Sequence, residues 1–156
     1  YIRDTTNSQL EKYFLDFHLF TEEERVFFNN REKLNINAVD LNILNITNAI
    51  KDKNIYKAQN NDMHLSFKIP DECLNRKNIG LEIDLTRDFG GFAQVFYKRT
   101  NENFSERNSI KKNFKDGRVN IKFLVNMDNL YNIRIDPTEK IEDVEIHNIN
   151  VLCEDK

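Results

Sequence analysis

The run Phe92-Ala-Gln-Val-Phe-Tyr-Lys-Arg99 opens the segment that decides the fold of this chain. It is followed by the polar loop Phe104-Ser-Glu-Arg-Asn-Ser109, and then by Val119-Asn-Ile-Lys-Phe-Leu-Val125 and Tyr131-Asn-Ile-Arg-Ile-Asp-Pro137. In the last two runs apolar and polar residues alternate, which is typical of strands with one face in a core and one in water. Together these runs predict the second half of an antiparallel β-sandwich.

The same alternation occurs earlier, at residues 63–69 and 79–85. Residues 92–99 differ, because bulky side chains occur on both faces, with Ala93, Val95 and Tyr97 on one and Phe92, Gln94 and Phe96 on the other. This pattern indicates a central strand whose outer face is partly covered or used. In the last strand the apolar phase slips by one residue, which predicts a β-bulge near His147–Asn148.

The N-terminal part gives weaker signals. Residues 12–20 fit either a helix or a strand, and their aromatic density favours a strand. Thr21-Glu-Glu-Glu24 is a helix-capping signal, and residues 34–50 indicate one or two further strands. With four glycines in the chain, we expect Asn to fill many left-handed turn positions.

The predicted fold class is therefore all-β, an antiparallel β-sandwich of jelly-roll type with at most short helical turns near the N-terminus. We expect an arm or linker at residues 1–10 and a single sandwich domain at residues 11–156, a size that can bury a sufficient core. Because the chain begins at Tyr1 rather than Met, a domain cut from a larger protein is one expectation.

Composition narrows the classes of function. The residues are 39% hydrophobic and 11% aromatic, the net charge is −3, and the basic residues are scattered among acids. A nucleic-acid binder usually carries a basic stripe, so no nucleic-acid partner is expected. No apolar run is long enough for a transmembrane segment. Heavy use of Asn, Lys and Ile suggests a bacterial source with an AT-rich genome.

No metal or catalytic site is expected from the sequence. His18, His64 and His147 are isolated, and neither Cys73 nor Cys153 lies at zinc-ligand spacing from another Cys or His. The two cysteines are expected to be separate thiols, although they could pair if the fold brought their Cα atoms within about 7 Å. Phosphate-binding and nucleophile motifs are absent, and no spacing singles out a glycosidase carboxylate pair.

Structural calcium is an alternative with little support. Asn61 with Asp62, and Asp136 with Glu139, could supply oxygen ligands, but ordinary turn chemistry explains both pairs. No other cofactor is expected.

The polar loop 98–113 is the best candidate for a ligand surface. Sugars are bound by planar polar side chains that satisfy hydroxyl groups, with an aromatic ring against the apolar sugar face. The alternative is an ordinary hairpin loop with Phe104 anchored in the core. Arg134 and Asp136 share a strand face, which predicts an intrastrand salt bridge. The candidate ligand-binding residues are Gln94, Tyr97, Phe104, Arg107, Asn108 and Arg134.

Four short runs carry a resemblance to a known family. They are Gln94-Val-Phe-Tyr97, Asn103-Phe-Ser-Glu-Arg-Asn-Ser109, Asn132-Ile-Arg-Ile-Asp-Pro137 and Val144-Glu-Ile-His-Asn-Ile149. In this order they resemble a galactose-binding-like jelly-roll module of the kind appended to bacterial glycosyltransferases and cell-surface polysaccharide biosynthesis proteins. The resemblance covers about residues 62–152.

The resemblance implies a non-catalytic, carbohydrate-binding-like accessory module whose partners are a glycan or a neighbouring catalytic domain. The sequence leaves the compartment open, with a leaning towards a cytoplasmic protein associated with the membrane through a larger parent. Since the chain has no Trp, Tyr97, Phe104 or Tyr131 would have to stack on the sugar. The alternative hypothesis is a structural sandwich that binds another protein through the outer face of strand 92–99, with no small ligand.

Overall fold

The structure is a computed structural model that describes residues 21–40 and 43–154. The chain divides into two compact units, residues 1–31 and residues 32–156. The predicted arm at 1–10 and the predicted strand at 12–20 lie outside the described residues. Among the described residues, no helix has the length and apolar character needed to cross a membrane.

The first unit contributes the helix α2 (Glu22–Asn29). The Thr21 hydroxyl accepts a hydrogen bond from the Glu24 backbone N–H at 3.1 Å, and the Glu24 carboxylate accepts one from the Thr21 N–H at 2.8 Å. This reciprocal capping box satisfies two N–H groups that have no partner within the helix. The helix that the Thr21–Glu24 signal predicted is thus confirmed.

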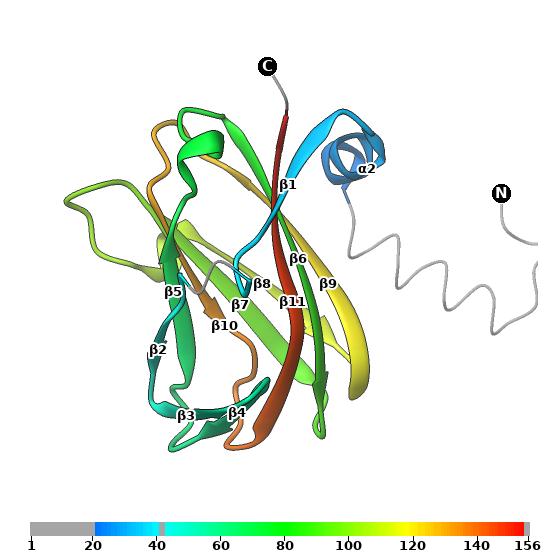
Figure 1. Cartoon of the computed structure of the whole chain (residues 1–156), viewed down its shortest axis with the longest axis vertical. Coiled ribbons are helices and arrows are strands. Elements are labelled where there is room, and N and C mark those ends of the chain that lie inside the picture. The colour runs from blue at the N-terminus through cyan, green and yellow to red at the C-terminus, as the bar shows by residue number, and fades with distance from the viewer. Residues whose placement is uncertain (1–20, 41–42, 155–156) are drawn as a thin grey trace, which may run out of the picture. The chain divides into compact units, whose positions relative to one another are not determined.

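The second unit is a sandwich of two antiparallel sheets (Figure 1). The first sheet has the order β3-β4-β11-β6-β9, with β1 also paired to β11, and the second has the order β2-β5-β10-β7-β8. The strands are β1 (Lys33–Asn37), β2 (Asn45–Thr47), β3 (Ala49–Asp52), β4 (Ile55–Ala58), β5 (His64–Lys68), β6 (Asn78–Arg87), β7 (Gly91–Lys98), β8 (Ser109–Phe114), β9 (Gly117–Asn126), β10 (Asn132–Asp136) and β11 (Asp143–Glu154). Two short 3₁₀ turns, η1 (Asp71–Cys73) and η2 (Glu106–Asn108), lie in the connections.

The predicted sandwich is therefore confirmed, and so is the interior position of β7, which lies between β10 and β8. The register of β11 against β6 shifts between Ile146 and Asn148, where the sequence predicted a bulge. Residues 34–50 hold β1, β2 and the start of β3, one strand more than the sequence indicated. The loop 98–113 is shorter than expected, because η2 and β8 already begin at Glu106 and Ser109.

The core lies between the two sheets and is built from the apolar side of each alternating run. Leu65, Phe67, Ile83, Phe123 and Ile133 are fully buried. Burying a side chain of this kind contributes about 1.5–3 kcal/mol relative to leaving it in water. The alternation thus fixes which side chains of β7 and β10 are left on the outer face of the second sheet.

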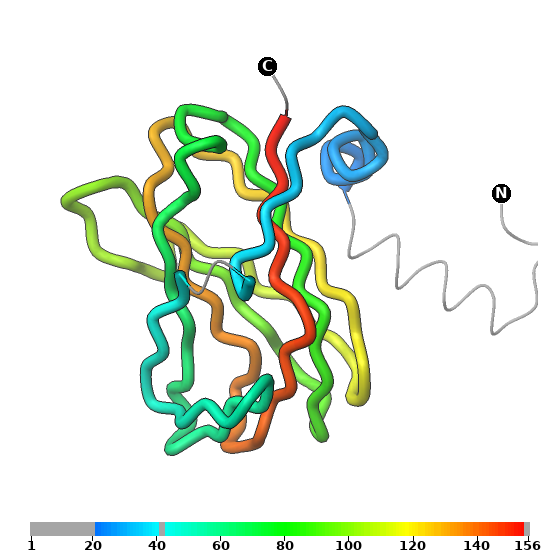
Figure 2. Tube along the Cα trace, viewed as in Figure 1, coloured from blue at the N-terminus to red at the C-terminus, as the bar shows by residue number. Residues whose placement is uncertain are grey.

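The turns confirm the expected role of asparagine. Among the described residues, five non-glycine residues have a positive φ angle, and four of them are asparagines. These are Asn48, Asn75, Asn101 and Asn129, with φ angles from 58° to 69°. The short polar side chain of Asn tolerates this left-handed conformation better than most residues do. Asn101 belongs to the loop between β7 and β8, which projects from the sandwich (Figure 2).

The expectation of two separate thiols is wrong. Cys73 in η1 and Cys153 in β11 form a disulfide, with their Cα atoms 5.7 Å apart. Their sequence separation of 80 residues hid this proximity, because only the fold brings η1 against the end of β11. Both residues are buried, so the bridge is part of the core.

Candidate functional site

The outer face of the second sheet carries a row of polar side chains with an aromatic ring beside it. Asp136 of β10 lies opposite Gln94 of β7, and Gln94 lies opposite Lys111 of β8. Phe92 is two residues before Gln94, so its ring projects from the same face. It is 39% exposed, which makes it an accessible aromatic surface on this strand.

These side chains line a depression of about 260 Å³, which we call the Phe92 pocket. Its lining residues are Asn61, Phe92, Gln94, Lys111, Asp136, Thr138 and Glu139. The pocket combines one apolar ring with amide, carboxylate, hydroxyl and ammonium groups. A concave site of this composition suits a small polar ligand that also has an apolar face.

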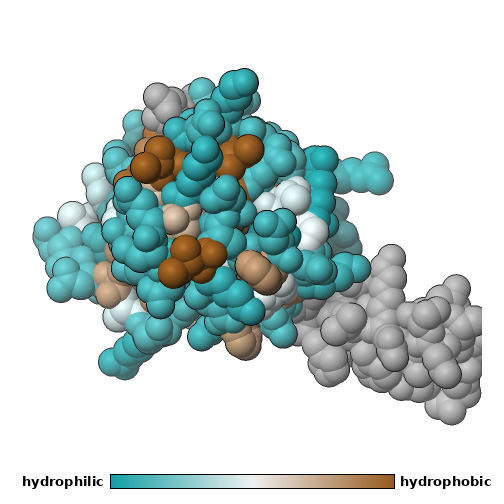
Figure 3. Space-filling view, turned by 90° about the horizontal axis from the view of Figure 1, so that it is seen from below, coloured by the Kyte–Doolittle hydropathy of each residue, from teal (hydrophilic) through white to brown (hydrophobic). Residues whose placement is uncertain are grey.

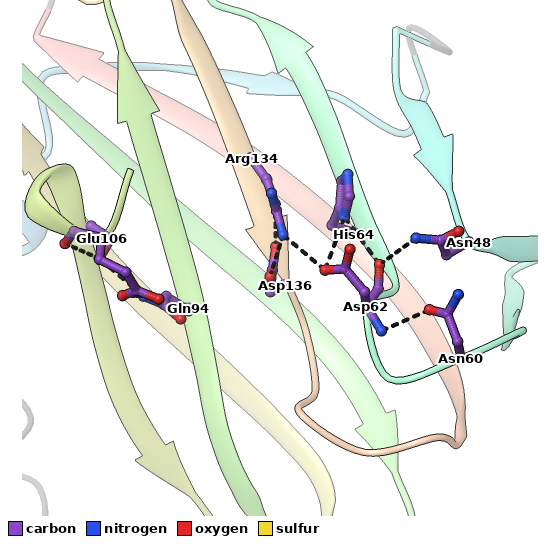
Figure 4. Close-up of polar contacts among 9 residues, drawn as sticks. Asn48, Asn60, Asp62, His64, Gln94, Glu106, Arg134 and Asp136 are labelled. Carbon is purple, nitrogen blue, oxygen red and sulfur yellow. Dashed lines mark hydrogen bonds and ion pairs between the residues drawn. The ribbon is translucent and has the colours of Figure 1, made fainter. Parts of the chain in front are cut away.

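Arg134 is the centre of the polar network next to the pocket (Figure 4). Its Nε and one terminal nitrogen donate to the two oxygens of Asp136 at 2.8 and 2.9 Å, and the same terminal nitrogen donates to Asp62 at 3.1 Å. The guanidinium lies over the ring of Phe96, 4.7 Å from its centroid. The predicted pairing of Arg134 with Asp136 is confirmed, and it extends to the β4–β5 loop.

The electrostatics of this pair follow from burial and from the contact. Burial alone would lower the pKa of Arg134, but the hydrogen bonds and charges of Asp136 and Asp62 outweigh it and raise that pKa. Burial raises the pKa of Asp136 above its ordinary value, more than the bond with Arg134 lowers it. The partners of Arg134 thus favour its charged form, whereas the buried surroundings of Asp136 disfavour its charged form.

Side chains from three segments, Asn60 of the β4–β5 loop, Asn48 between β2 and β3, and His64 of β5, hold Asp62 next to Arg134 (Figure 4). The Asp62 N–H donates to Asn60 at 2.8 Å, and its carbonyl accepts from the Asn48 side chain at 3.1 Å. The imidazole Nδ1 of His64 lies 3.1 Å from the same carbonyl and 3.7 Å from the Asp62 carboxylate. His64 is thus engaged in fixing the loop that brings Asn61 to the pocket.

A second polar contact links the pocket to the loop between β7 and β8. The Gln94 side-chain nitrogen donates to the Glu106 carboxylate at 2.7 Å and to the Ser109 hydroxyl at 3.0 Å. The Ser109 hydroxyl in turn donates to the Glu106 carbonyl at 2.8 Å. These bonds set the position of η2 against β7.

Two buried charged side chains outside the pocket lining, Arg87 and Glu142, hold the backbone segments next to it. Arg87 is 2% exposed and donates to the carbonyl oxygens of Gly91 at 2.7 Å, Pro137 at 2.8 Å and Phe114 at 3.1 Å. Glu142 accepts from the N–H groups of Asp88 and Phe89 and from the Thr138 hydroxyl. Together they tie the start of β7, which carries Phe92, to the β10–β11 loop.

Glycine is required at position 91 for the same packing. Gly91 has φ of +138°, which L side chains rarely adopt, and a Cβ added there would lie 2.8 Å from the Glu139 carboxylate. Burial lowers the pKa of Arg87, while the negative charges of Glu142 and Glu139 oppose this shift. The start of β7 therefore depends on the backbone conformation of Gly91, which places its carbonyl oxygen 2.7 Å from the buried Arg87 guanidinium.

The structure brings together some of the predicted site residues and separates others. Gln94 lines the pocket and Arg134 lies beside it. Tyr97 packs against the core, on the opposite face of β7 from Gln94. In the β7–β8 connection Phe104 is half-buried beneath the Lys98 ammonium, Arg107 is exposed, and Asn108 is half-buried.

Sequence reasoning missed most of the pocket lining. Phe92 could have been found, because the period-2 rule places it on the Gln94 face. Asp136 was predicted as the partner of Arg134, but not as a ligand-binding residue. Asn61, Lys111 and Glu139 come from other strands and loops, and their convergence depends on the register and on the corner after Pro137.

Two of the carboxylates named for the calcium alternative have another partner in the structure. Within residues 21–40 and 43–154, no three His, Cys, Asp or Glu side chains gather where they could hold one metal ion. Asp62 and Asp136 both pair with Arg134. His147, at the bulge in β11, lies 2.9 Å from the hydroxyl of Thr86 in the neighbouring strand β6 of the first sheet, and it does not line the pocket.

Exposed apolar side chains occur near the turn that follows β6. Phe89 is 52% exposed and Ile141 is 64% exposed, and the Lys140 ammonium lies over the Phe89 ring at 5.6 Å. Figure 3 views this end of the sandwich and shows apolar side chains in small groups separated by hydrophilic ones. These residues lie outside the Phe92 pocket.

Comparisons with known proteins place the fold. No family model and no curated protein sequence matches the chain. Among solved structures, the xylan-binding module CBM15 is similar with a TM-score of 0.55 and 6% identity, over 80% of this chain and 99% of that one. A Clostridium thermocellum xylanase 10B structure containing CBM22-1 and GH10 modules, in complex with xylohexaose, is similar with a TM-score of 0.50 and 9% identity, over 80% of this chain and 26% of that one.

At these identities the likeness concerns the fold alone. The expected architecture is confirmed: the chain has the two-sheet β-sandwich fold found in carbohydrate-binding modules.

Proposed function

We propose that the chain is a non-catalytic module that binds a glycan on the outer face of its second sheet. The observation that carries this proposal is the accessible Phe92 ring, set in a pocket among Gln94, Lys111 and Asp136. The C–H face of a sugar can lie against the ring while its hydroxyl groups bond to the surrounding polar groups. The fold of the two similar structures, a xylan-binding module and a xylanase solved with xylohexaose, supports a glycan ligand.

The likeness to modules rather than to whole enzymes supports a binding role without catalysis. The resemblance across residues 62–152 leads us to include a larger bacterial parent protein in the proposal, with a glycosyltransferase or another polysaccharide-synthesis domain as the neighbour. The disulfide between Cys73 and Cys153 favours an oxidising compartment, because such bonds are rare in the cytosol. We therefore propose a site of action outside the cytosol, whereas the sequence left the compartment open with a leaning towards the cytoplasm.

The test is a titration of the chain with xylohexaose and with other linear glycans, followed by amide NMR shifts and calorimetry. We expect shifts concentrated on β7, β8 and β10 around Phe92. Phe92→Ala should weaken binding by about tenfold, the scale of one lost aromatic contact. The matched control is Phe89→Ala, since Phe89 is also an exposed ring but lies outside the pocket.

Equal binding by Phe92→Ala and the unchanged chain would place the ligand elsewhere, and no shift with any glycan would refute a glycan-binding function. Arg107→Ala tests the loop predicted from the sequence, and under this proposal it leaves binding almost unchanged.

A second candidate function is protein binding without a small ligand, and the exposed Phe89 and Ile141 side chains favour it. In that case Phe89→Ala, and not Phe92→Ala, would weaken association with the neighbouring domain of the parent protein. Light scattering of the chain mixed with that domain measures this association.

A further inference from the structure

The orientation of the Gln94 amide is fixed by its neighbours (Figure 4). A carboxylate can only accept hydrogen bonds, so the Gln94 nitrogen, and not its oxygen, must face Glu106 at 2.7 Å. The Ser109 hydroxyl donates its hydrogen to the Glu106 carbonyl, so its oxygen accepts the second hydrogen bond from the Gln94 nitrogen at 3.0 Å. Both donors of Gln94 are used by the protein, which leaves its Oε1 as the atom available to a ligand.

The neighbouring polar groups of the pocket also present acceptors. Asp136 receives two hydrogen bonds from Arg134 and keeps further lone pairs, since a carboxylate has about four acceptor positions. Glu139 is a second carboxylate in the lining. The Thr138 hydroxyl donates its hydrogen to Glu142, so it too has no donor to offer.

Two groups that can donate also line the pocket, the Asn61 amide and the Lys111 ammonium. The Lys111 ammonium lies 4.8 Å from the centroid of Phe92. Its charge is opposed by that of Glu139, and the charge of Asp136 is opposed by that of Arg134. Arg134 also pairs with Asp62, so the pocket lining together with this pair holds one more acidic than basic group, and this charge acts together with the direction of the hydrogen bonds.

We propose that Glu106 sets the specificity of the Phe92 pocket by locking Gln94 with its oxygen toward the ligand, so that the pocket selects neutral glycans that donate hydroxyl hydrogens over glycans that carry carboxylate groups. This inference rests on the proposed function. A uronic acid carboxylate placed beside Gln94, Asp136 and Glu139 would meet acceptors with no hydrogen to share. Selectivity then comes from unpaired groups in the wrong complex as much as from bonds in the right one.

Glu106→Gln is the decisive variant, because it keeps the size of the side chain and can either donate or accept. Gln94 is then free to turn its amide by half a turn and present its nitrogen to the pocket. The matched control is Glu102→Gln in the same loop, since Glu102 accepts from the Arg99 N–H and touches no pocket residue.

The experiment compares xylohexaose with a xylo-oligosaccharide of the same length that bears one glucuronic acid. The unchanged chain and Glu102→Gln should bind the neutral glycan about tenfold more tightly, and Glu106→Gln should bring this ratio close to one. A purely structural role for Glu106 would lower both affinities together and leave the ratio unchanged, and that result overturns the inference.

A readout without ligand separates this inference from the proposed function. In the free protein the Gln94 side-chain amide hydrogens should exchange slowly with solvent, and Glu106→Gln or Ser109→Ala should accelerate that exchange. Fast exchange in the unchanged chain overturns the lock. If the exchange is slow but no glycan binds, the proposed function fails and the specificity fails with it. If glycans bind with equal affinity whether or not they are charged, only this inference is overturned.

Discussion

Removal of the buried Arg87 guanidinium is the sharpest test of how the pocket is held. We consider Arg87→Met, which keeps most of the buried aliphatic stem and deletes the charged group. The Gly91, Pro137 and Phe114 carbonyl oxygens then lose their donor in an interior that water does not reach easily. Glu142 also loses the nearby positive charge that opposes its own.

The magnitude follows from the balance of two effects. A hydrogen bond from a charged donor contributes about 1.5–3 kcal/mol, and three strong ones are lost. Against this, the cost of burying the guanidinium is relieved, and that cost is several kcal/mol. Because the lost bonds leave buried carbonyl oxygens without a donor and Glu142 without a nearby positive charge, we expect the free energy of unfolding to fall by about 3–5 kcal/mol.

Urea unfolding followed by far-UV circular dichroism measures this loss, and the method suits a chain that has no Trp for fluorescence. The slope of free energy against urea should stay constant, so that the change appears in the midpoint. Arg118→Met is the matched control, because Arg118 pairs with Asp84 at the surface and its loss should have a far smaller effect. The double variant Arg87→Met/Glu142→Gln should lose less stability than the sum of the losses in the two single variants, since each single variant removes the charge that opposes the other.

A stability of Arg87→Met within about 1 kcal/mol of the unchanged chain would refute the reasoning, because it would mean that desolvation cancels the bonds of the guanidinium. A large loss without coupling to Glu142 would leave Arg87 important but would refute the joint role of the two charges.

Three further predictions concern other parts of the sandwich. The hydrogen bond and charge of Arg118 lower the pKa of Asp84 below 3.8, so this contact stabilises the fold fully above that value and is lost as pH falls through the folded pKa. Asp84→Asn should therefore be less stable than the unchanged chain at pH 7, and acid unfolding should show this difference shrinking as Asp84 becomes protonated. Burial raises the pKa of Tyr56 above 10.0, so the contribution of the buried neutral phenol to stability is full below pH 10 and is lost as pH rises further. Tyr56→Phe should therefore keep its stability better at alkaline pH, as unfolding measured by circular dichroism would show. Replacing both Cys73 and Cys153 by Ala should lower the free energy of unfolding in urea by about 2–5 kcal/mol, and an unchanged midpoint would contradict a disulfide that closes a long loop.

The period of the apolar residues made the sheet predictable. In β5, β6, β9 and β10 every second residue is apolar, and a strand places such residues on one face whatever its partners are. The slip before Ile149 predicted the bulge for the same reason, because one extra residue reverses the phase. The Arg134–Asp136 pair was also local, since two residues at spacing two share a face.

The candidate site was predictable only in part. Gln94 and Arg134 belong to strands whose pattern is clear, and the structure places both on the outer face of the second sheet. Tyr97 was grouped with Gln94 because the two are near in sequence, yet an odd spacing along a strand turns their side chains to opposite faces. Phe92, at even spacing, is the aromatic residue that shares the Gln94 face.

Sequence by itself determined the strands, their buried faces, the helix cap at Thr21 and the turns that Asn can form, because each depends on residues close together in the chain. Tertiary structure alone decided the pairing of Cys73 with Cys153, the position of Arg87 among four carbonyl groups, and the meeting of Asn61, Lys111 and Glu139 around Phe92. These contacts join segments that are far apart in sequence, and their register is set by the packing of two sheets, which leaves no mark in any single segment.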